Sequence, residues 1–135
     1  MRYPLLITLV LFLFSCGRES EKPSTALDTG RAFIRASLDG DFESAESLLL
    51  PDTQNLQFFE TYKVYYDQKV SKEKKEQNKN ASFEINKFLE LDDSTTIINY
   101  SNQYMVKPME IKVVRKDNEW KIDFKYTYSG NLPIN

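Results

Sequence analysis

The hydrophobic period of this 135-residue chain changes once, near residue 81, and this change constrains the fold more than any other feature. Before it, apolar residues recur every three or four positions, as Ile34 and Leu38 do, which is typical of amphipathic helices. After it they alternate, as Ile111 and Val113 do, which is typical of half-buried strands. Helices followed by strands predict an α+β domain in which three N-terminal helices pack on a four-stranded antiparallel sheet.

Capping residues divide the first half of the chain into three predicted helices. Thr25 suits the N-cap of the first helix, and Gly40 suits the left-handed position after its last turn. Asp41 suits the N-cap of a short second helix. A third helix is expected to begin at Asp52 or Thr53.

The second half predicts a loop and then strands. The polar stretch 69–80 is expected to be the frayed end of the third helix followed by a loop. Lys87 breaks the alternation of the first strand, which indicates a bulge or a sheet edge. Asp117 and Asn118 predict a tight hairpin turn, and the alternation over 120–128 predicts a long last strand.

The alternation places four apolar residues on one face of the first strand and four on the second strand: Phe83, Ile85, Leu89 and Leu91, then Ile98, Tyr100, Tyr104 and Val106.

Composition excludes several kinds of chemistry. The chain has no histidine, which removes histidine bases, histidine triads and histidine metal ligands. Its one cysteine excludes an internal disulfide and a cysteine-rich metal site. A formal charge of −2 argues against a nucleic-acid binder, and the glycine-poor sequence has no phosphate-binding fingerprint. No cofactor, metal site or nucleic-acid partner is therefore expected.

The N-terminus has the pattern of an export signal. Arg2 is followed by ten residues, 5–14, of which only Thr8 is polar, and this run is too short to span a bilayer. It ends in Leu13-Phe14-Ser15-Cys16, which resembles the lipobox of bacterial lipoproteins. The alternative is an ordinary secretory signal followed by an incidental cysteine.

The lipobox resemblance implies a signal peptide over residues 1–15 and a lipid on Cys16 that anchors the protein in the membrane of the bacterial cell envelope. Gly17 in place of an aspartate retention signal favours the outer membrane over the inner. Residues 16–24 are polar and predict a flexible tether, which leaves 25–130 as the folded domain.

Two segments carry a second resemblance. Residues 33–48, FIRASLDGDFESAESL, and 118–122, NEWKI, resemble the opening helices and the final hairpin of NTF2-like (cystatin-like) domains. The similarity is greatest to the small lipoprotein families of that superfamily, the DUF4878-type and lumazine-binding-like domains. The resemblance implies a curved sheet wrapped around the long helix, forming a cone with one open mouth. It is also compatible with a homodimer through the open sheet face.

A group of aromatic residues is the candidate binding site. These side chains are either plain core or the lining of a cone that takes a small ligand: Phe59, Tyr62, Tyr66, Tyr100, Trp120 and Tyr126. No catalytic residue is assigned. The expected function is a non-catalytic, lipid-anchored domain that binds a small ligand or an envelope protein. The alternative is an isomerase or cyclase that uses an interior carboxylate and a tyrosine.

Overall fold

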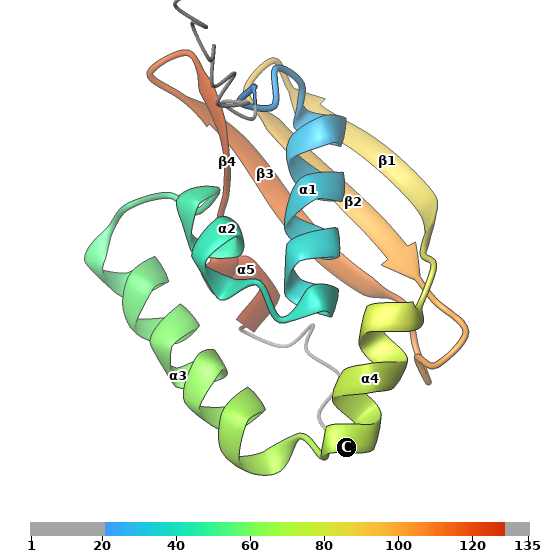
Figure 1. Cartoon of the computed structure of the whole chain (residues 1–135). Coiled ribbons are helices and arrows are strands. Elements are labelled where there is room, and N and C mark those ends of the chain that lie inside the picture. The colour runs from blue at the N-terminus through green and yellow to red at the C-terminus, as the bar shows by residue number, and fades with distance from the viewer. Residues whose placement is uncertain (1–20, 129–135) are drawn as a thin grey trace, which may run out of the picture.

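A four-stranded antiparallel sheet and five helices form the domain in the computed structural model, which describes residues 21–128 (Figure 1). The predictions for residues 1–15 and Cys16 lie outside this range. The elements are α1 (Ala26–Asp39), α2 (Phe42–Ser47), α3 (Thr53–Lys69), α4 (Lys72–Asn80), β1 (Glu84–Asp92), β2 (Thr95–Ser101), β3 (Met109–Lys116), β4 (Glu119–Ile122) and α5 (Phe124–Tyr128). The α+β class and the four antiparallel strands are as predicted.

Side-chain caps begin the first three helices where the sequence predicts them. The Thr25 hydroxyl accepts a hydrogen bond from the backbone of α1, and the carboxylates of Asp41 and Asp52 do the same for α2 and α3. Gly40 ends α1 with a φ of 71°, a left-handed conformation that glycine adopts at low cost. These local signals are confirmed.

The strands follow one another in space in the order β1-β2-β3-β4. Asp117 and Asn118, with φ of 51° and 61°, form the turn between β3 and β4, as predicted. The pairing of β1 with β2 shifts register between Ile85 and Lys87, which confirms the irregularity expected at Lys87.

The core lies between α1 and the inner face of the sheet. On the sheet side, Ile98, Ile111 and Val113 are fully buried. Gly30 brings α1 close to the sheet, because a Cβ at this position would overlap the side chain of Ile98. Burial of these apolar side chains supplies most of the favourable free energy of folding.

The loop predicted for residues 69–80 is wrong, because most of that stretch forms helix α4. Ser71 provides the N-cap by accepting a hydrogen bond from the backbone N–H of Lys74. The lysines and glutamates that follow are good helix formers. Because apolar residues do not recur periodically in this stretch, the hydrophobic pattern could not predict the helix.

The long last strand is also wrong. β4 ends at Ile122, and the chain turns into the short helix α5. The backbone N–H of Lys125 donates to the buried Asn55 side chain at 2.8 Å instead of to a neighbouring strand. A hydrogen bond from Tyr126 N to Asp123 O at 3.2 Å completes the turn.

Of the eight apolar positions predicted for the first two strands, Ile98 and Tyr100 are buried, whereas four are exposed. Leu89 and Leu91 lie on the edge strand β1, and Leu91 is 57% exposed. Tyr104 and Val106 lie in the loop after β2, which ends at Ser101, and Val106 is 82% exposed. Within residues 21–128, no helix is both long enough and apolar enough to cross a bilayer.

Candidate functional site

Six aromatic rings form a continuous group between α1, α2, α3 and α5, which we call the aromatic cluster: Phe33, Phe42, Phe59, Tyr62, Tyr66 and Phe124. Most neighbouring rings meet edge to face or tilted. The Phe42 and Tyr66 centroids are 4.8 Å apart at 88°, and those of Phe59 and Phe124 are 5.1 Å apart at 89°. Such pairs add about 0.5–1.5 kcal/mol each beyond the burial of their area. The cluster is therefore tightly packed.

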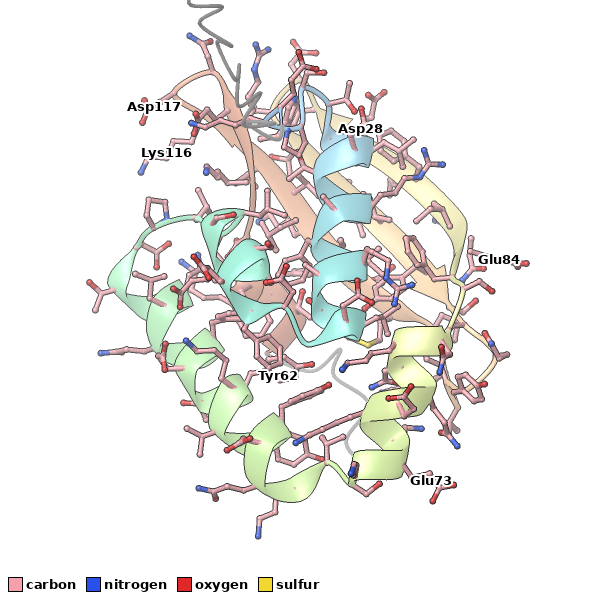
Figure 2. The ribbon with its side chains drawn as sticks, in the orientation of Figure 1. Asp28, Tyr62, Glu73, Glu84, Lys116 and Asp117 are labelled. Atoms are coloured by element: carbon pink, nitrogen blue, oxygen red, sulfur yellow. The ribbon has the colours of Figure 1, made fainter. Side chains whose placement is uncertain are left out.

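Of the six aromatic residues predicted to line a cone, three lie in this cluster: Phe59, Tyr62 and Tyr66. Figure 2 shows the Tyr62 side chain on the inner side of α3, where its ring lies 5.8 Å from those of Phe42 of α2 and Phe124 of α5. The sequence did not single out the other three members, Phe33, Phe42 and Phe124, as site residues. Phe42 directly follows the Asp41 cap, which is the local signal that places it beside α3.

The other three residues have separate partners. Tyr100 packs against Phe83 at 6.3 Å, and its hydroxyl lies 3.6 Å from the sulfur of Met109. Trp120 lies on β4 with the Arg115 guanidinium 5.9 Å from its ring, and the Tyr126 hydroxyl donates to a carboxylate oxygen of Glu110 at 3.1 Å.

Trp120 also lines an open cleft of about 420 Å³ at the end of the domain where the described chain begins. Lys22 and Lys121 both pair with Glu119 here, at 2.8 and 3.4 Å. The Lys22 pair is exposed, and exposed pairs contribute about 0–1 kcal/mol. The cleft is distinct from the aromatic cluster, because Trp120 belongs to no ring pair of the cluster.

Three hydroxyls on α1 and α3 make no hydrogen bond among the described residues, and only that of Ser37 is both buried and unpaired. Ser37 lies one helical turn after Phe33, so it shares the face of α1 whose ring contacts Phe59. The hydroxyls of Tyr62 and Tyr66 contact rings but accept or donate no hydrogen bond within residues 21–128. A buried polar group left unpaired costs about 1–3 kcal/mol.

The tyrosines of this region are neutral hydrogen-bond donors at physiological pH. Burial, and then the neighbouring Tyr66, raise the pKa of Tyr62 to about 12. Burial also raises the pKa of Tyr100. The pKa of Tyr66 is raised by burial and by the nearby Asp39 carboxylate.

Carboxylate chemistry has little support at the cluster. No aspartate or glutamate between residues 21 and 128 is buried as a whole, although the Oδ1 atom of Asp123, next to Phe124, is buried without a hydrogen-bond partner and its Oδ2 atom pairs with Lys112 at 3.6 Å. A carboxylate held neutral or basic by an apolar environment is the group that isomerase chemistry on such a fold requires. In the same part of the chain, no group of three or more acidic or cysteine side chains is placed to hold a metal ion.

Fold and cluster together define a small α+β domain with an open antiparallel sheet and a packed aromatic centre. The sequence model of the DUF4878 family, described as a domain of unknown function, matches residues 14–123. The chain therefore belongs to the DUF4878 family. No curated protein and no solved structure matches it.

Proposed function

We propose that this protein is a lipid-anchored lipoprotein of the cell envelope whose NTF2-like domain binds a small ligand without catalysing a reaction, at the aromatic cluster when its packed rings move apart. The observation that carries the ligand site is the buried, unpaired hydroxyl of Ser37, one helical turn after Phe33 of the aromatic cluster. A ligand that hydrogen-bonds to this hydroxyl would remove the cost of leaving it unsatisfied.

The chemistry of the cluster favours one class of ligand. The aromatic rings favour a ligand with an apolar or planar framework, and the neutral hydroxyls favour a ligand that carries a carbonyl or another oxygen acceptor. The raised pKa of Tyr62 keeps its hydroxyl a donor and disfavours a ligand that requires a tyrosinate. We therefore propose an uncharged planar molecule that carries at least one carbonyl.

Membrane anchoring is supported by the resemblance of residues 13–16 to a lipobox, and the geometry of the domain is compatible with it. A fully extended chain from Cys16 to Ala26 spans at most about 35 Å, which limits how far the start of α1 can lie from the membrane. Figure 2 places Asp28 and the hairpin residues Lys116 and Asp117 at this same end, with Glu73 of α4 at the other. The aromatic cluster would then lie on the side of the domain away from the membrane.

Cys16→Ser tests the anchor. We expect the wild-type protein to fractionate with membranes and to incorporate radiolabelled palmitate. The Cys16→Ser variant should be released and should take up no label. Ser20→Ala, a change in the tether outside the lipobox, is the matched control and should behave as wild type. A Cys16→Ser variant that still incorporates palmitate would refute the lipoprotein assignment.

Native mass spectrometry of protein purified from its own cells tests the ligand. We expect an added mass of a few hundred daltons on the wild type, reduced in Ser37→Ala and Tyr62→Phe. Tyr65→Phe changes an exposed tyrosine of α3 and should retain the ligand. The absence of any noncovalent adduct, beyond the covalent lipid on Cys16, in all of these proteins would refute the ligand site.

A second candidate function is binding of a protein partner at β1. This strand is an edge of the sheet, and it exposes Phe88, Leu89 and Leu91. An extended segment of another protein would continue the ladder by strand addition. A photo-crosslinker at Leu89 should then give one defined adduct in cells, whereas a crosslinker at Val64 on α3 should not. A crosslinked product at twice the subunit mass would indicate a homodimer.

A further inference from the structure

Helix α4 is attached to the domain almost entirely through polar contacts. None of its nine residues is buried. A helix of this length is marginally stable on its own, so its neighbours must hold it in place. The only adjoining residue that enters the interior is Ala81, directly after the helix, which is 2% exposed.

Arg35 of α1 makes the contacts that hold the end of α4. Its guanidinium donates to the backbone oxygen of Ala81 at 2.7 Å and to those of Asn78 and Lys79 at 3.2 and 3.3 Å. Asp39, one turn along α1, accepts two hydrogen bonds from the same guanidinium, at 2.8 and 3.1 Å, and orients it. A cation at the C-terminus of a helix also complements the helix dipole.

The other contact of α4 lies over the aromatic cluster. The ammonium of Lys75 lies 5.0 Å from the ring centroid of Tyr66 and 3.3 Å from the backbone oxygen of Asp67. Tyr66 is only 7% exposed with α4 in this position. Movement of α4 away from α3 would therefore uncover one side of Tyr66.

We propose that α4 is a lid over the Tyr66 side of the aromatic cluster and that Arg35 is its latch. The segments on either side of the helix, Val70–Ser71 and Ala81–Ser82, act as the hinges, because they have extended or irregular backbone. The role of this lid as the ligand gate rests on the proposed function. The opening itself depends only on the contacts of α4.

Hydrogen exchange of the full-length chain tests the latch. In Arg35→Ala, we expect the amides of residues 72–81 to exchange about tenfold faster than in wild type, because three charge-assisted hydrogen bonds are lost. Arg35→Lys keeps the charge but lacks the planar fork, so it should exchange nearly as fast as Arg35→Ala. Arg31→Ala removes an exposed arginine from the same helix and should match wild type.

Thiol labelling at the buried residue 81 provides a second measurement of the opening of α4. In a Cys16→Ser background, Ala81→Cys provides the one thiol of the chain, and its labelling rate reports exposure of residue 81. Adding Arg35→Ala should increase this rate by about tenfold. The lid proposal is overturned if the rate is unchanged, or if exchange rises equally across α1, α4 and the sheet, which would indicate global destabilisation.

The lid and the ligand site fail in different ways. Unchanged exchange in Arg35→Ala together with a retained ligand would overturn the lid and leave the ligand site in place. Faster exchange over 72–81 without any ligand in the wild type would keep the lid and overturn its role as a gate.

Discussion

The Tyr66 hydroxyl lies 3.1 Å from the position that a Cβ on Gly40 would occupy. Gly40 also has a left-handed backbone, so the end of α1 and the aromatic cluster both depend on the absence of a side chain there. We expect Gly40→Ala to lower the free energy of unfolding by about 1–2 kcal/mol, measured by urea denaturation.

A double-mutant cycle separates the two causes of this loss. Backbone strain remains in a Tyr66→Phe background, whereas the contact with the hydroxyl does not. Gly40→Ala should therefore cost less in Tyr66→Phe than in wild type. An equal cost in both backgrounds would mean that the contact contributes nothing.

Gly30 should respond to substitution through Ile98. A methyl group at residue 30 would overlap the Ile98 Cδ1 atom, and overpacking of a core typically costs about 1–3 kcal/mol. This cost exceeds the gain in helix propensity of about 1 kcal/mol. Gly30→Ala should therefore destabilise the protein, as measured by chemical denaturation.

Ile98→Val deletes the atom that the new methyl group would overlap. The double variant Gly30→Ala/Ile98→Val should be less destabilised than the sum of the single variants. Strict additivity would contradict the close approach of α1 to the sheet.

Asn55 connects the start of α3 to α5 and should be sensitive to truncation. Its side chain is fully buried, donates to Asp52 at 2.7 Å and accepts from the backbone of Lys125 at 2.8 Å. Asn55→Ala leaves that backbone N–H without its partner, and we expect a loss of about 2–3 kcal/mol in thermal or chemical unfolding. Gln54→Ala, at the exposed neighbouring position, should change stability by less than about 0.5 kcal/mol.

The stability of the fold should fall at high pH because of Tyr62. Its pKa is about 12 in the folded protein against 10 in the unfolded chain, so unfolding favours loss of the phenolic proton. The stabilising contribution is complete below pH 10 and is lost as the pH rises toward 12. Tyr62→Phe should show a shallower decline in unfolding free energy over this range. Identical slopes would show that Tyr62 is not protected from ionisation.

Local signals were sufficient for the first three helices and for the β3–β4 turn. Thr25, Asp41 and Asp52 bond to backbone groups within three residues, so the sequence around each cap already contains both partners. Asp117 and Asn118 likewise need only their own tolerance of positive φ.

Tertiary contacts decided the remainder. The alternation over 120–128 suits a strand, but the Asn55 side chain, 70 positions from Lys125, takes the backbone donor that a longer strand would have used. Helix α4 has no apolar period, and its place is fixed by Arg35, 46 positions from Ala81. The aromatic cluster was predicted only in part. The sequence shows which residues are aromatic, but the packing of α1, α2, α3 and α5 against one another decides which rings come into contact.

The one change in hydrophobic period determined the α+β class, since a helical and a strand period cannot describe the same structure. The single cysteine within a lipobox pattern, the absence of histidine and the helix caps were also properties of the sequence alone. The tertiary structure decided which hydroxyls are left unpaired and which helix covers Tyr66. Both features depend on contacts between side chains that are far apart in the sequence. The hydrophobic period describes only local structure, so it does not show which distant residues meet in space.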